Sequence, residues 1–231
     1  MSDKGVSLEA SDILDLGGTW IPQSVTDGTN QEWARMTDAD GKWLKWSNEF
    51  NDINEISAVY KFNAITGLPA ALPLLGDVRN GYLVTGIEIE SVYNDWPTVT
   101  FTAHNHGTNG HVTGESLNTW DLSTDLATAT GAFGTYDWAG LAAEEVCAQR
   151  STISASFSHL DAECAGGDHW VGQNIQAQLS ATVEYIGHIG STTVANWNTA
   201  SYNYSDANED FDHSSITIEK PLDGTISSDP A

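Results

Sequence analysis

The chain has 231 residues, and its 32 acidic residues against 8 Lys and Arg give a formal net charge of -24. Its length allows one substantial core, and a hydrophobic share of 40% with 9 Trp, 7 Tyr and 6 Phe excludes a disordered chain. An acidic surface without a cluster of Lys or Arg predicts no tight binding to nucleic acid and none to a membrane surface. Simple solvation or adaptation to salt explains the same charge. We expect one β-rich domain over residues 1–231.

The lack of a recognisable targeting segment and the small number of cysteines argue against further classes of protein. The N-terminus, MSDKGVSLEASDILDLGG, has no basic region followed by an apolar run, and no stretch approaches ~20 apolar residues. We therefore expect neither a signal peptide nor a membrane span. Cys147 and Cys164 are too few for a disulfide framework and lack zinc spacing. They are expected to be free thiols, with a single disulfide as the alternative.

The first predicted element is a hairpin near the N-terminus. The runs WARM (33–36) and KWLKW (42–46) flank Asp38-Ala39-Asp40-Gly41, whose Asp-Gly step suits a tight turn. The same residues resemble part of a calcium loop. However, Met36 and Ser47 stand where an EF-hand needs carboxylates, so a plain turn is expected.

A second hairpin is predicted over residues 82–104. Its first strand alternates Ile87 and Ile89 with Glu88 and Glu90, and a turn ending at Pro97 follows. The second strand alternates apolar residues with threonines: Val99, Phe101 and Ala103 against Thr98, Thr100 and Thr102. Such alternation predicts antiparallel strands with one buried face.

Three histidines follow this strand. His104 and His106 share the parity of the threonines, and His111 lies beyond a Gly-rich turn. Two histidines at i and i+2 can chelate a metal, but a cupin-like site needs a carboxylate three or four residues later, and the first one is Glu115. We therefore predict no metal, with these three histidines as the remaining candidates. Another polar group has the pattern of a solvated loop: His159, Asp161, Glu163, Asp168 and His169.

Two segments resemble helices. Leu117 to Leu126 is one, and Asp137 to Cys147, DWAGLAAEEVC, is the other, with Asp137 in a capping position. One short helix is predicted.

The longest alternation predicts a third hairpin. In STISASFSH (151–159) and NIQAQLSATVEY (174–185), apolar residues alternate with Ser, Thr, Gln and Glu. The tail from Asp223 to Ala231 is polar and is expected to be flexible. The predicted fold is mainly β, an antiparallel β-sandwich or barrel with one short helix.

Catalytic motifs are missing from the sequence. It contains no GxSxG, GxxxxGK[ST], GxGxxG or HExxH pattern, and with 32 acids a carboxylate pair is expected by chance. The sequence predicts neither an enzyme nor a cofactor.

Two stretches resemble tailed-phage virion proteins, including tail-tube-like proteins. They are GYLVTGIEIESVYNDWPTVTFTAHNHGTNGH and STISASFSHLDAECAGGDHWVGQNIQAQLSATVEYIG, in the middle half of the chain. This resemblance implies a virion protein, assembled in the host cytoplasm, that forms rings, usually of six, which stack into a tube with an acidic lumen. The implied partners are further copies and other virion proteins. Residues 62–80 would supply the long connecting loop of that family.

The strand from residue 174 suggests which side chains would line such a lumen. They are Gln176, Gln178, Ser180, Thr182 and Glu184. Two other functions stay open. Trp197 and Tyr202 to Asp206 favour a carbohydrate-binding or receptor-binding module, because aromatic rings stack on sugars. A metal-dependent enzyme would use His104 and His106.

Overall fold

The structure is a computed structural model, and it describes a defined set of residues. They are 14, 21–37, 39–40, 42–62, 72–92, 95–106, 117–122, 137–138, 141–142, 147–163, 169–187, 197–205 and 212–222. The tail predicted to be flexible, 223–231, lies outside them.

In the described part of the chain, nine strands form one antiparallel sheet in the order β1-β2-β5-β4-β8-β9-β11-β10, with β3 paired to β4. Their bounds are β1 (Ile21–Thr37), β2 (Trp43–Lys61), β3 (Val78–Arg79), β4 (Tyr82–Val92), β5 (Thr98–His106), β8 (Cys147–Glu163), β9 (His169–Ile186), β10 (Asn198–Ser205) and β11 (His213–Pro221). The prediction of a mainly antiparallel β fold is confirmed. Among the described strands the sheet is open, with β1 and β10 at its edges.

The three predicted hairpins are confirmed. Strands β1 and β2 pair around residues 38–42, β4 pairs with β5, and β8 pairs with β9 over most of their length. Alternation also predicted the buried face of β9 correctly, because Ala177, Leu179, Ala181, Val183 and Tyr185 are all buried. The residues between them are half-buried or exposed.

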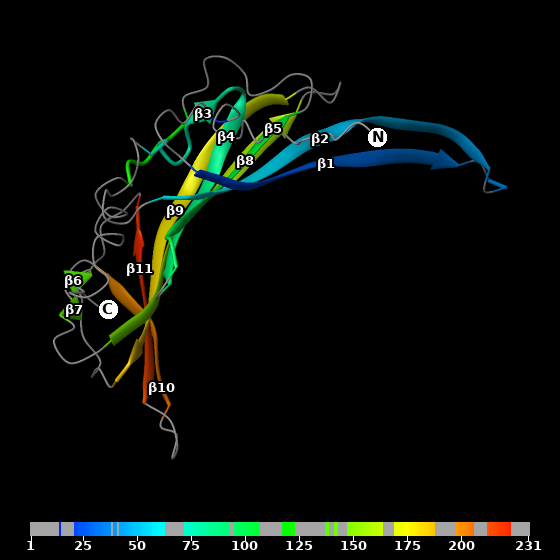
Figure 1. Ribbon diagram of the computed structural model, residues 1–231. Helices are drawn as coiled ribbons and strands as arrows, with labels where there is room; N and C mark the ends of the chain where they lie inside the picture. The colour runs from blue at the N-terminus through cyan, green and yellow to red at the C-terminus, as the bar shows by residue number, and fades with distance from the viewer. Residues whose placement is uncertain are drawn as a thin grey trace, which may run out of the picture.

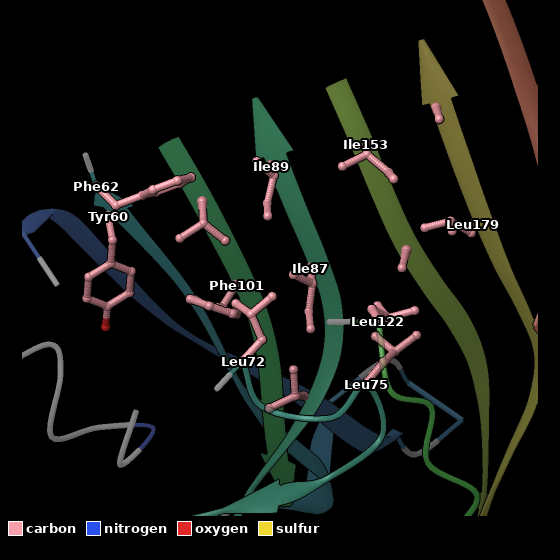
Figure 2. Packing of buried hydrophobic residues seen from close by; sticks show 14 of the residues in the cluster. Tyr60, Phe62, Leu72, Leu75, Ile87, Ile89, Phe101, Leu122, Ile153 and Leu179 are labelled. Carbon is pink, nitrogen blue, oxygen red and sulfur yellow. The ribbon is translucent and has the colours of Figure 1, made fainter. Parts of the chain in front are cut away.

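The core lies on one face of the sheet, under two covering segments. Figure 2 shows Phe101 on β5 beside Ile87 on β4, and Ile153 on β8 at the level of Ile89, with Leu75 and Leu122 near these side chains from outside the strands. Residues 72–77 and 117–122, defined here as the covering segments, are joined by the Leu75–Trp120 bridge. Within the expected connecting loop, residues 72–79 therefore fold back on the sheet, and 63–71 lie outside the described residues.

The predicted helix is wrong where the structure describes it. Within residues 137–147 the chain forms β6 (Asp137–Trp138) and β7 (Leu141–Ala142), an antiparallel pair, and Cys147 begins β8. Residues 117–122 are not helical either, and Trp120 forms a single β-bridge with Leu75. Tertiary contacts often override the helix propensity of a segment. In addition, a glycine such as Gly140 destabilises a helix interior by about 1 kcal/mol relative to alanine. None of the described residues belongs to a helix that could cross a membrane.

The sheet is strongly curved, and its first hairpin extends beyond it. In Figure 1 the β1–β2 ribbon projects to the right, while β9, β10 and β11 continue downward. Strand β5 pairs with β2 only from Ile53 to Lys61, so residues 43–52 pair only with β1. We call this two-stranded extension the arm.

Candidate functional surface

The face of the sheet opposite the core is polar from β2 to β11. Cross-strand pairing places its residues in rows, because partners in an antiparallel ladder point to the same face. One row holds Val59, Thr100, Glu88, Ser154, Ser180 and Glu219, and the next holds Lys61, Thr98, Glu90, Thr152, Thr182 and Thr217. Each of these side chains is half-buried or exposed. A face made mostly of hydroxyls and charges is poorly suited to packing a second sheet of the same chain.

Interactions within this polar face connect neighbouring strands. Arg150 on β8 forms an ion pair with Glu90 on β4. The hydroxyls of Thr182 and Thr217 lie 3.0 Å apart across β9 and β11. These contacts neutralise few of the charges on the polar face. Carboxylates such as that of Glu88, which is exposed, therefore remain in contact with solvent.

Four of the five lumen candidates on β9 belong to the polar face. Gln178, Ser180, Thr182 and Glu184 are paired to Ser156, Ser154, Thr152 and Arg150 of β8 in turn. Gln178 and Glu184 are exposed, and Ser180 and Thr182 are half-buried. Gln176 differs, because it has a φ of 56° and lies where the β8–β9 register shifts. It is exposed, but the bulge removes it from the ladder.

The bulge at Gln176 changes the burial of Asn174. Regular alternation would place Asn174 with Gln176 and Gln178 in contact with solvent. Instead, Asn174 is 0% exposed. The extra residue in β9 thus brings a polar side chain into the buried region beneath the covering segments.

His104 is near a histidine that is distant in the sequence. Its ring centroid lies 5.4 Å from that of His159 on β8, although β4 lies between β5 and β8 in the sheet. His159 also packs against Phe157, which in turn packs against Trp120 of a covering segment. The structure therefore brings together His104 and His159, a pair that local spacing did not predict.

Asn174 connects this pair to both covering segments. Its Oδ1 lies 2.6 Å from Nδ1 of His159. Its Nδ2 donates to the carbonyl oxygens of Asn118, at 2.9 Å, and Gly76, at 3.4 Å. Asn118 in turn donates from Nδ2 to the carbonyl oxygen of Asn174 at 3.1 Å. One buried side chain thus holds 72–77 and 117–122 against β9.

The predicted histidine run is only partly described. His106 ends β5 opposite Ile53, and its side chain is outside the description, as is the whole of His111. In the described part of the chain, no group of three or more His, Cys, Asp or Glu could hold a metal ion. The alternative group around His159 is likewise described only at His159, as its other members have no described side chains.

Two of the hollows on the described surface are lined mainly by polar residues. One, of about 410 Å³, is lined by Glu55, Ser57, Thr85, Thr102 and His104 together with Thr26 and Gly28 of β1. The other, of about 460 Å³, lies across β8, β9, β11 and β10. Polar residues dominate its lining: Gln149, Glu184, Asn203, Ser205, His213, Ser214 and Ser215, besides Tyr185 and Tyr204.

The aromatic residues that favour sugar binding have different environments. The ring of Trp197 has Lys220 Nζ 5.1 Å above its centroid. Tyr202 is half-buried against the core, whereas Tyr204 is 44% exposed and its hydroxyl donates to Asp212 at 3.0 Å. A sugar could not stack on the covered face of Trp197 without displacing the lysine, so Tyr204 is the more accessible ring.

An ion pair between Lys61 and Asp95 lies at the β4–β5 turn. Asp95 accepts a hydrogen bond from Lys61 Nζ at 2.9 Å and one from the backbone N–H of Trp96 at 2.7 Å. The lysine, and secondarily the N–H, hold the pKa of Asp95 below its usual range.

No family model matches this chain, and no curated protein matches its sequence.

Proposed function

We propose that this chain is a self-assembling virion structural protein, a tail tube subunit whose rings, of six copies, stack around an acidic lumen. The polar face of the sheet is the observation that carries the proposal. It extends over six neighbouring strands, and among the described residues no apolar layer covers it. Such a face suits a wall exposed to water, with the core and covering segments on its outer side.

The open sheet supports assembly through its edges. Strand β10 forms one edge, its residues are nearly all exposed, and its sequence NTASYNYS has no charged residue or proline. Monomeric proteins usually protect such an edge with lysine, proline or a covering loop. Pairing of β10 with β1 of a neighbouring copy would continue the sheet around a ring and remove both edges.

The arm adds a second argument. Residues 43–52 of β2 pair only with β1, and a two-stranded ribbon is marginally stable by itself in water. Contact with a neighbouring subunit would stabilise it. The arm is therefore suited to linking copies within a ring or between rings.

The charge fits the passage of DNA. A lumen lined by Glu88, Glu184 and Glu219 would repel phosphates, so DNA would slide along it without binding. The proposed partners are copies of the chain and other virion proteins. Nucleic acid and membranes are not among them.

Electron microscopy of concentrated protein tests the proposal. We expect rings or hollow tubes, and more of them as salt rises, because salt screens the repulsion between subunits of charge -24 over a Debye length of ~10 Å at 0.1 M. The protein should also pass through a DNA column even at low salt, where a basic binder is held most tightly. A protein that stays monomeric at high concentration across this salt range would refute the assignment.

Two proline variants test the edge directly. Backbone N–H groups of successive strand residues point to opposite sides, so Asn203→Pro and Tyr204→Pro each remove a donor from a different side of β10. One variant should lower the melting temperature by several degrees because it breaks the β10–β11 ladder. The other should keep the wild-type melting temperature and lose assembly. Rings formed by that stable variant would exclude pairing at β10.

A second candidate function is glycan or receptor binding at the 460 Å³ hollow. Amide, carboxylate, hydroxyl and imidazole groups converge there, and such groups recognise sugar hydroxyls. Asn203→Ala and Glu184→Ala should then weaken binding to a glycan array, whereas Gln178→Ala, outside the hollow, should not. Rings without any glycan signal would leave the tube subunit as the only function.

A further inference from the structure

The two edge strands of the sheet run in opposite directions. The path from β1 to β10 contains eight of the nine strands, since β3 lies off it, and each neighbouring pair on the path is antiparallel. Strand direction therefore alternates, and β10 points opposite to β1. In a ring of subunits with rotational symmetry, every copy of β1 has the same direction relative to the axis. Strand β10 of one copy would then meet β1 of the next copy in antiparallel orientation.

Tyr204 and Val25 lie at opposite edges of the core face. Tyr204 on β10 is paired with Ser214, and Ser214 with Tyr185, which is buried in the core. At the other edge, Val25 on β1 is paired with the buried Ala58 and packs against the core. Cross-strand partners point to the same face, so both edge residues belong to the core side of the sheet. Tyr204 is nonetheless 44% exposed and Val25 is only half-buried.

Asn203 and Thr26 lie at the same two edges, on the polar face. Asn203 is paired with Ser215, and that serine with Glu184 of the polar face. Thr26 is paired with Ser57, and both Thr26 and Asn203 are exposed. A junction between the two edges can thus match apolar with apolar on one face and polar with polar on the other. The polar face would then continue from one copy to the next.

Regular pairing within each edge strand limits the register of such a junction. Strand β1 pairs with β2 without interruption over Ser24–Asn30, and β10 pairs with β11 without interruption over Ser201–Ser205. Antiparallel alignments that keep the second stretch within the first and match the faces place Tyr204 opposite either Val25 or Asp27. An aromatic side chain opposite a β-branched one is stabilising, whereas an aspartate supplies no such packing. The register with Val25 is therefore favoured.

We propose that β10 of one copy pairs with β1 of the next in antiparallel orientation, in the register that places Tyr204 opposite Val25. The same register places Asn203 opposite Thr26. This inference rests on the proposed tube assembly, because the rotational symmetry of the ring sets the direction of the strands. The junction covers the exposed side chain of Tyr204, and removal of its apolar surface from water favours assembly.

Crosslinking between two cysteine variants tests the register on the full-length chain. Asn203→Cys and Thr26→Cys are prepared separately, mixed under assembly conditions and treated with a thiol crosslinker that has a one-carbon spacer. Cβ atoms of directly opposite residues lie about 4.5–5.5 Å apart, within reach of this reagent. We expect several-fold more covalent dimer than in a mixture of Asn203→Cys with wild-type protein, in which Cys147 and Cys164 set the background.

Further mixtures report the other register and the strand direction. Asn203→Cys with Gly28→Cys detects the register in which Tyr204 faces Asp27. Ser205→Cys with Ser24→Cys detects the antiparallel direction, and Ser205→Cys with Gly28→Cys the parallel one. A Cβ at Gly28 meets no atom within 4 Å, so the cysteine fits. Positions two residues apart on a strand differ by about 7 Å, which separates these signals.

The expected dimer forms from the Asn203–Thr26 and Ser205–Ser24 mixtures, and either mixture is decisive if a variant of the other fails to fold. Stronger crosslinking to Gly28→Cys would overturn the proposed junction. So would a dimer of Asn203→Cys alone, which would indicate that two β10 strands meet about a two-fold axis.

Electron micrographs of the same samples separate this inference from the proposed function. Rings or tubes without the expected crosslinks would overturn the junction and leave the tube subunit in place. The expected crosslinks in open filaments would support the junction and refute the closed ring. Neither rings nor crosslinks at any salt concentration would refute both.

Discussion

Gly76 and Asn118 lie so close together that a Cβ added at Gly76 would collide with the carbonyl oxygen of Asn118. The added Cβ would also lie 2.8 Å from Nδ2 of Asn174. In addition, Gly76 has a φ of 86°. A side chain is therefore excluded twice, by contact and by backbone conformation. This is the point at which the covering segments reach the sheet.

Gly76→Ala should consequently destabilise the protein much more than Gly81→Ala. Gly81 has a similar φ of 82° but open space around it, so alanine there costs only the left-handed conformation, about 1–2 kcal/mol. The collision at Gly76 should add about 1–3 kcal/mol. Urea unfolding of both variants measures the difference. Equal losses would show that the covering segments move aside easily.

Gly86 on β4 allows Thr102 on β5 to lie across it on the polar face. A Cβ at Gly86 would collide with Oγ1 of Thr102, its cross-strand partner. We expect Gly86→Ala to cost about 1–3 kcal/mol and Thr102→Ala, at an exposed position, less than about 0.5 kcal/mol. In the double variant the collision disappears, so the losses should not add. Additive unfolding free energies would contradict this contact.

Asp95 should titrate below an ordinary aspartate. The hydrogen bond from Lys61 is the largest cause, so Lys61→Met should raise the pKa of Asp95 towards its usual range, and Lys42→Met, a lysine in the turn at the tip of the arm, should not. A lowered pKa means that the ion pair contributes stability above the usual range and loses it as pH falls through the lowered value. Since Asp95 is exposed, this contribution is small. Carboxyl carbon NMR follows the titration, and an unchanged midpoint in Lys61→Met would be evidence against the ion pair.

Cys147 and Cys164 should remain thiols. Cys147 begins β8, and Glu163, the residue before Cys164, ends it. An extended strand of this length spans ~50 Å, whereas a disulfide needs Cα atoms within ~7 Å. Denatured protein prepared without reductant should thus react with about two equivalents of Ellman's reagent per chain. A monomer whose mass rises by two units on reduction would disprove this.

Alternation along single strands was readable from the sequence. The apolar positions of β9, such as Leu179 and Val183, and the glutamates of β4 lie on the predicted faces, because side chains in a strand alternate whatever its partners. Turn residues such as Pro97 also marked the hairpins correctly. The polar lumen candidates other than Gln176 share one face for the same reason.

The tertiary structure decided what depends on pairing between distant residues. No local pattern indicated the bulge at Gln176 that buries Asn174, or the strand order that brings His104 to His159 around β4. The segment 137–147 shows the same limit, since its Ala, Leu and Glu favour a helix locally and the chain nonetheless forms β6 and β7. Local sequence determined the two faces of each strand. Only long-range pairing, whose free energy is shared among residues far apart in the chain, determined which strands became neighbours and which polar groups were buried between them.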